Sequence, residues 1–143
     1  MVYRQILLSV RHSQLSLNTM RLLSTYFVIL TFASLNPWLN LDYGLAIGNI
    51  AWDKISHAAA YCLLSLLFMS AYKFHKQKLA VSFLILMTCS LVGVLFEYLQ
   101  LWLTSTREFS YYDAVANSFG AVLGVALYWC YLFVAKKRAK YIR

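Results

Sequence analysis

The sequence predicts an all-α integral membrane protein, a bundle of four transmembrane helices with both termini in the cytoplasm. Composition is the first observation behind this prediction. Of the 143 residues, 62% are hydrophobic and only 13% are charged, whereas soluble domains are about 45–50% apolar. The mean hydropathy is +0.62. The other two observations are the apolar segments, which indicate the number of spans, and the placement of basic residues, which indicates their orientation.

Four apolar segments are long enough to cross a bilayer, which takes roughly 17–25 residues of helix. They cover residues 22–39, 53–72, 79–103 and 112–135. Helix is the expected conformation, because backbone groups in hydrocarbon must be hydrogen-bonded within the protein. No small-residue cleavage site follows the first segment, so we expect a retained span and not a signal peptide.

Basic residues lie mainly on one side of these segments. Three precede the first segment, three join the second to the third, and five follow the fourth, which leaves only Lys54 and Arg107 of the 13 for the other side. The positive-inside rule then places both termini in the cytoplasm. The expected division is a basic tail over 1–21, a four-helix domain over 22–135 and a basic tail over 136–143. Topology thus accounts for the net charge of +8, and we expect no nucleic-acid partner.

Acidic residues show the opposite distribution. All five map to the outer helix ends or outer connectors, where Lys54 and Arg107 join them: Asp42, Asp53, Glu97, Glu108 and Asp113. Ionisable groups from several helices are therefore predicted to gather at the outer end of the bundle. This rim is the candidate site.

The second span opens with an acid, a base and a histidine. Asp53 and His57 are four residues apart and share a helix face, whereas Lys54 points elsewhere and can reach the interface. Asp53 fits a simple role as a helix N-cap as well as a role in a site. His57 lies about 6 Å inside the helix and needs a polar partner, for which Asp53 is the nearest local candidate.

The third span ends with Glu97 and Gln100 on one face. Glu97 lies about 7 Å from the helix end. Lipid disfavours its carboxylate, and so does the negative C-terminal end of the helix dipole. We therefore expect Glu97 to face protein or water, either as a functional group or as a polar clamp.

The fourth span repeats the four-residue spacing with Asp113 and Asn117. Ser110 and Asp113 also fit a variant of the helix capping box, which is a structural alternative for Asp113. Asn117 lies inside the span, where an amide either bonds a neighbouring helix or binds a ligand. Gly120 and Gly124 form a GxxxG pattern, which predicts close helix packing.

Residues 50–128 resemble the VanZ-like family of small bacterial membrane proteins. The resemblance rests on an ordered set of residues: Asp53-Lys54-x-x-His57-x-x-x-Tyr61, Glu97-x-x-Gln100, Arg107, and Asp113-x-x-x-Asn117-x-x-Gly120-x-x-x-Gly124. It implies a multi-pass protein of the bacterial cytoplasmic (inner) membrane with a role in the cell envelope. The founding members are linked to resistance to the glycopeptide teicoplanin. The resemblance implies no particular reaction.

Two classes of function fit the rim. The first is binding or processing of the head group of an envelope lipid, such as a lipid-linked saccharide, or of a glycopeptide-related ligand. Lys54 and Arg107 would meet phosphate, and the acids and amides would meet hydroxyls. The residues expected to bind ligand are Asp53, Lys54, Gln100, Arg107, Asp113 and Asn117. The alternative is a small transporter or a structural or assembly protein, and the sequence leaves the oligomeric state open.

Enzymatic chemistry has one candidate pair. His57 could act as a general acid or base with Glu97 or Asp53. Walker and dinucleotide-binding glycine motifs are missing from the sequence, so no cofactor is expected. A single histidine at the rim argues against a transition-metal site, although Asp53, Glu97 and Asp113 could hold a hard cation with water. The three cysteines fall inside predicted spans and are expected to be packing residues.

Overall fold

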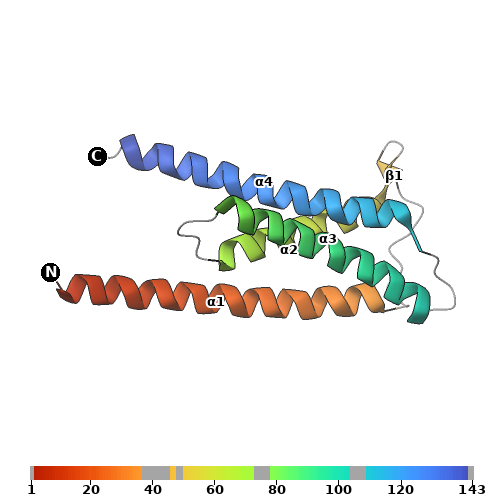
Figure 1. The fold of residues 1–143 in the computed structure, drawn as a ribbon, viewed down its shortest axis with the longest axis horizontal. Coiled ribbons are helices and arrows are strands. Elements are labelled where there is room, and N and C mark those ends of the chain that lie inside the picture. Colours follow the sequence, from red (N-terminus) through yellow and green to blue (C-terminus); the bar gives the residue numbers. More distant parts are fainter. Residues whose placement is uncertain (1, 37–45, 48–49, 73–77, 104–108, 142–143) are drawn as a thin grey trace.

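The computed structural model describes residues 2–36, 46–47, 50–72, 78–103 and 109–141 as an all-helical bundle (Figure 1). The helices are α1 (Val2–Leu35), α2 (Trp52–Ala71), α3 (Lys78–Leu103) and α4 (Tyr111–Tyr141). Two-residue strands β1 (Ala46–Ile47) and β2 (Ile50–Ala51) pair antiparallel just before α2. The predicted all-α class is confirmed, and the small hairpin is an addition to it.

Three of these helices are long and apolar enough to cross a membrane. They are α2, the stretch of α3 from Leu79 and the stretch of α4 to Ala139, with α3 the most apolar at a hydropathy of 2.5. Helix α1 is not among them. Its predicted span contains the hydroxyl residues Ser24, Thr25 and Thr31, which lower its hydropathy. A fourth span and cytoplasmic termini therefore stay predictions.

Helix boundaries differ from the expected ones at α1 and α4. Residues 2–21 are helical and continuous with the predicted span, instead of forming a separate tail. Helix α4 likewise continues beyond residue 135 to Tyr141. Neither stretch contains a glycine or proline that would stop a helix. The chain's single proline, Pro37, follows α1, and helices usually end before the residue that precedes a proline, so α1 stops at Leu35 and not at residue 39.

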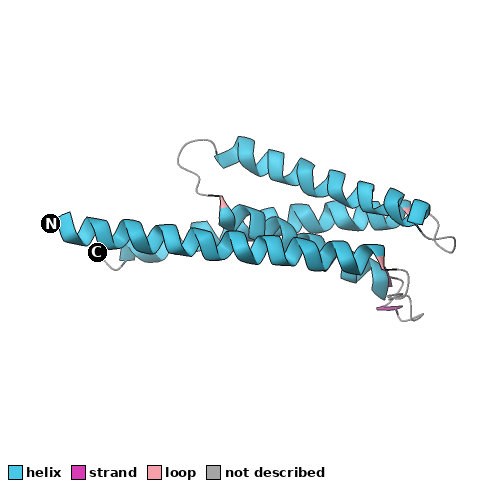
Figure 2. Ribbon diagram, turned by 90° about the horizontal axis from the view of Figure 1, so that it is seen from below, coloured by secondary structure: helices cyan, strands magenta, loops and turns pink. Residues whose placement is uncertain are grey.

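The helix ends sort into two groups. The start of α1, the end of α2, the start of α3 and the end of α4 lie toward one end of the bundle, while β1 and the start of α4 lie at the other (Figure 1). Viewed after a quarter turn, the four helices still run along one common axis (Figure 2). Lys136 and Lys137 in the last turns of α4 are therefore far from Lys54 at the start of α2.

The most extensive helix contact joins α2 to α4. Gly120 lies against the backbone of Ala58, and Gly124 lies against the Cys62 carbonyl and the Ser65 hydroxyl. A Cβ atom at either glycine would overlap these atoms. The two helices approach this closely because α4 presents no side chain at these positions.

Helix α1 packs on α2 and α3. The Tyr26 hydroxyl donates a hydrogen bond of 2.9 Å to the Ala60 carbonyl in α2. Gln100 in α3 donates one of 2.8 Å to the Ser34 carbonyl in α1. Gln100, a predicted ligand-binding residue, thus ties two helices together.

Candidate functional site

At the start of α2, the Lys54 ammonium forms ion pairs with Asp53 in the same helical turn and with Asp113 in α4. The Asp53 carboxylate accepts hydrogen bonds from the Lys54 backbone at 2.8 Å and from Lys54 Nζ at 2.6 Å. Lys54 Nζ also forms a salt bridge with Asp113 Oδ1 at the start of α4. The expectation that Lys54 points away from the helix face of Asp53 is therefore wrong. Its ammonium bridges the first turns of two helices.

His57 bonds across the bundle instead of along its own helix. Its Nδ1 lies 3.0 Å from Asn117 Oδ1 in α4. The local partner suggested by the spacing was Asp53, whose carboxylate turns to Lys54 instead. An amide oxygen can only accept, so in this pair Nδ1 carries the hydrogen and the second ring nitrogen, Nε2, is left for another partner.

Asn117 is held in place by a glycine that the sequence analysis did not single out. Only 1% of Asn117 is exposed. A Cβ atom at Gly93 in α3 would lie 2.8 Å from Asn117 Cβ and 3.1 Å from its Nδ2. Gly93 therefore provides the space in which the amide sits. The available signal was a lone glycine within the most apolar span.

Glu97 is enclosed by the bundle, with 2% of its surface exposed. One ligand-type atom each from His57, Glu97 and Asp113 lies within 4.8 Å of the other two. Tyr61 is also buried, and it interacts electrostatically with the Glu97 carboxylate. The motif contained Tyr61, but no role was predicted for it. Three helices thus bring an imidazole and two carboxylates to one point.

Asp113 is positioned by the start of α4. Its backbone N–H donates a 3.2 Å hydrogen bond to the Ser110 hydroxyl, so Ser110 caps the helix as the spacing suggested. The Asp113 side chain faces Lys54 and the His57–Glu97 pair. Capping is therefore done by Ser110, and the Asp113 carboxylate belongs to the polar cluster.

We define the polar cluster as the residues that these contacts join at the end of the bundle where α2 and α4 begin and α3 ends: Asp53, Lys54, His57, Glu97, Asp113 and Asn117. Gln100 is engaged with α1, as described above. Arg107, Glu108 and Asp42 lie outside the described residues. The cluster spans the start of two helices and the last two turns of a third.

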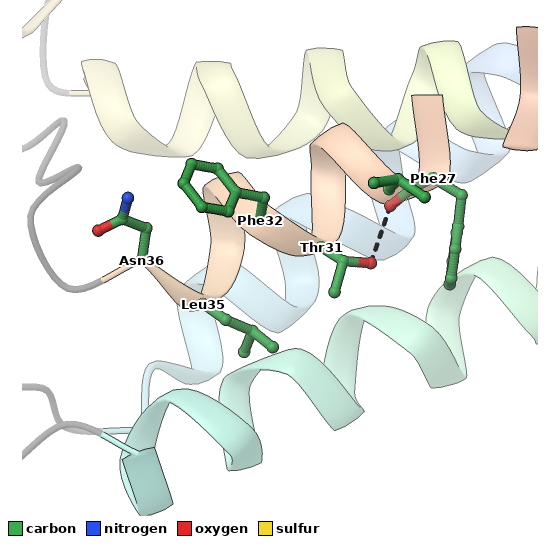
Figure 3. Close-up of a pocket in the computed structure, with 6 residues that line it drawn as sticks. Phe27, Thr31, Phe32, Leu35 and Asn36 are labelled. Carbon is green, nitrogen blue, oxygen red and sulfur yellow. Dashed lines mark hydrogen bonds between the residues drawn. The ribbon is translucent and has the colours of Figure 1, made fainter. Parts of the chain in front are cut away.

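A separate apolar groove lies on α1. It has a volume of about 690 Å³ and is lined by Phe27, Val28, Thr31, Phe32, Leu35 and Asn36 (Figure 3). Thr31 Oγ1 donates its hydrogen bond of 2.8 Å back to the Phe27 carbonyl, so the hydroxyl does not serve the groove. No residue of the polar cluster lines this groove. It resembles the lipid-facing side of a helix more than a polar binding site.

The family resemblance of the sequence is confirmed by comparison with models of known protein families. A family model described as VanZ/LLP1 matches residues 3–134. The chain belongs to the VanZ/LLP1 family. The match extends beyond residues 50–128, where the motif was found, and includes all of α1 except its first residue. Separate comparisons with curated proteins and with solved structures gave no significant match.

Membership gives the polar cluster a context without assigning its chemistry. The VanZ/LLP1 match covers every member of the cluster and both glycines of the α2–α4 contact. Together with three helices able to span a bilayer, it indicates a membrane protein. The family match specifies neither a ligand nor a reaction.

Proposed function

We propose that this VanZ/LLP1 protein is a cell-envelope protein of the bacterial cytoplasmic membrane whose polar cluster binds the head group of an envelope lipid or a glycopeptide-related ligand. The observation that carries the proposal is the convergence of His57, Glu97 and Asp113 from three different helices. Ionisable residues within membrane spans are costly, and they generally mark sites of function. A purely mechanical contact between helices does not require three groups that can exchange protons.

The chemistry of the cluster suits a polyhydroxylated head group. Carboxylates accept hydrogen bonds from hydroxyls, and an amide can both donate and accept. Lys54 is the cation within the described cluster, and it is shared between Asp53 and Asp113. A phosphate would have to compete with these two carboxylates. Arg107, for which we retain the predicted role in phosphate recognition, would supply a second cation with a planar fork.

Processing of the ligand would use His57 and Glu97. The Asn117 bond orients the imidazole through Nδ1, which leaves Nε2 to take or give a proton. Glu97 is buried, and its carboxylate lies within 4.8 Å of the imidazole atom in the group. The pair is therefore placed for general acid–base catalysis, provided that a substrate atom lies between the two groups.

A structural role is the second candidate, because two contacts of the cluster join α2 to α4. These are the Lys54–Asp113 salt bridge and the His57–Asn117 hydrogen bond. In that case the cluster would specify how the helices pair, as interhelical polar contacts do in membranes. The two roles predict different results for a change that preserves shape.

Glu97→Gln is that change, because it keeps the side-chain shape and removes the charge. If the cluster binds a head group, we expect loss of binding of a labelled polyprenyl-phosphate lipid and altered teicoplanin susceptibility at equal membrane abundance. A structural role predicts wild-type behaviour in both assays. Ser118→Ala is the matched control, because its hydroxyl bonds only its own helix, to the Ala114 carbonyl at 3.0 Å.

Arg107→Lys tests the predicted phosphate contact in the same assays. The change keeps the positive charge and loses the planar fork, so bidentate recognition predicts weaker binding by roughly tenfold or more. If Arg107 acts only as a charge, the variant will bind the lipid as the wild type does. Unchanged binding in both Glu97→Gln and Arg107→Lys would reject the head-group proposal.

A further inference from the structure

We propose that His57, Glu97 and Asp113 bind one divalent transition-metal ion. Within the described residues, these three offer an imidazole nitrogen and two carboxylate oxygens from three helices, all within 4.8 Å of one another. The sequence argued against such a site because it places one histidine at the rim. The folded chain supplies the other two ligands as carboxylates. This inference goes beyond the proposed function, since ion binding can be measured without any lipid. When the ion is bound, His57 and Glu97 serve as its ligands in place of the acid–base role described above.

The spacing of the ligand atoms suits a small divalent ion. Bonds from such ions to nitrogen or oxygen are about 2.0–2.2 Å, so the ion must lie at about this distance from each of the three ligand atoms. The three atoms lie within 4.8 Å of one another before any ion is present, which places each of them at most about 2.8 Å from their common centre. An inward movement of each side chain by no more than about 0.7 Å is therefore enough to close the site.

The hydrogen bond between His57 and Asn117 prepares the imidazole to bind a metal. Metal-binding histidines usually donate their second ring N–H to an oxygen, which fixes the tautomer and the ring orientation. Here Nδ1 lies 3.0 Å from Asn117 Oδ1, which leaves the lone pair of Nε2 for the ion. Asn117 is itself buried and held against Gly93. The orienting residue is thus more rigid than a solvent-exposed partner would be.

The charge of the cluster also calls for a cation. Asp53, Glu97 and Asp113 are three carboxylates, and Lys54 is the one ammonium among the described cluster residues. With His57 neutral and the acids ionised, the cluster carries a formal charge of −2. A net charge between apolar helices is expensive. One divalent ion brings the formal charge of the cluster to zero.

The ligand set selects the class of ion. Mg²⁺ and Ca²⁺ prefer sites built from oxygen alone, whereas an imidazole suits Zn²⁺ or Fe²⁺, and the two carboxylates also suit Mn²⁺. Three protein ligands also leave at least one coordination position open, as in catalytic zinc sites. A phosphate or hydroxyl oxygen of a ligand could occupy it. The ion would then supply the positive charge that Lys54, already paired with two carboxylates, provides only in part.

The test uses the full chain purified in detergent, stripped with chelator and titrated with Zn²⁺ and separately with Mn²⁺. We expect one ion per chain, not displaced by excess Mg²⁺. His57→Gln, Glu97→Gln and Asp113→Asn should each weaken binding at least about a hundredfold, and Asn117→Ala should weaken it about tenfold with the stoichiometry kept. His12→Gln is the control, because residue 12 lies in the first half of α1, toward the opposite end of the bundle.

Substoichiometric binding by the wild type would overturn the proposal. So would binding that survives His57→Gln and Glu97→Gln, or that is lost in His12→Gln. X-ray absorption spectroscopy identifies the ligand atoms around Zn²⁺ in the wild-type protein, so this measurement does not depend on whether any variant folds. We expect one imidazole nitrogen with oxygen ligands, and a sulfur ligand or a hexa-aqua spectrum would contradict the assignment. Ion binding without lipid binding would leave this inference standing and reject the proposed function alone.

Discussion

His57 in α2 lies 3.0 Å from Asn117 in α4, and this hydrogen bond crosses the helix pair that packs most extensively. The bond spans 60 residues of sequence. One turn closer to the start of both helices, Lys54 and Asp113 join the same pair. Further along α4, Gly120 and Gly124 bring the backbones together. The polar contacts and the close backbone packing are thus two parts of the one interface between α2 and α4.

Removing the charge of Lys54 should destabilise the α2–α4 pair. Lys54→Met would leave Asp53 and Asp113 without their shared cation. The side chains of Lys54 and Asp113 are 27% and 14% exposed, so we expect a loss of about 1–3 kcal/mol, below the value for a fully buried pair. Unfolding in mixed micelles, followed by tryptophan fluorescence, measures the change. The double variant Lys54→Met with Asp113→Asn should lose less than the sum of the single variants. Strict additivity would show that the salt bridge contributes nothing.

A side chain at Gly120 should separate α2 from α4. In Gly120→Val, the new atoms would overlap the backbone of Ala58, which cannot move aside as a flexible side chain would. We expect a loss of about 3 kcal/mol or more, at the upper end for overpacked cores. The comparison is Ala126→Val, which adds atoms to an exposed position of the same helix. Equal effects of the two variants in the same unfolding assay would contradict close packing at Gly120.

Gly93→Ala should disturb Asn117 without touching any charged residue. The added methyl group would lie 2.8 Å from Asn117 Cβ, which forces a shift and should cost about 1–3 kcal/mol. The shift should also lengthen the His57–Asn117 hydrogen bond. Nitrogen-15 chemical shifts of the imidazole report this directly, and Asn117→Ala gives the reference for complete loss of the bond. An unchanged imidazole spectrum in Gly93→Ala would show that α3 does not position the amide.

The orientation of the bundle can be tested with reporter fusions. Eleven of the 13 basic residues precede the first apolar segment, join the second to the third or follow the fourth, so the positive-inside rule predicts an inactive alkaline phosphatase when it is fused after Arg143. The same enzyme inserted within residues 40–49 should be active. The reverse pattern would place the polar cluster at the cytoplasmic face and would exclude a ligand in the outer leaflet.

The sequence by itself determined the helices, the end of the bundle where the ionisable groups gather, and the family. The lengths of the apolar segments indicate α2, α3 and α4, because a helix needs a minimum number of apolar residues to cross the hydrocarbon core of a membrane, whatever the fold. The same argument was less decisive for α1, whose hydroxyl residues dilute its hydropathy and whose helix continues through the expected tail. Pro37 is the residue in the sequence that indicates where α1 ends.

Only the tertiary structure decided which groups meet. Spacing along one helix shows that Asp53 and His57 share a face, and it favours a local pair. The folded chain pairs His57 with Asn117 and Lys54 with Asp113 as well as Asp53. It also brings Glu97 to both His57 and Asp113. These partners depend on how far each helix is rotated and how closely α4 approaches α2. That approach is set by Gly120 and Gly124 meeting the backbone of another helix, and periodicity along a single segment carries no information about it.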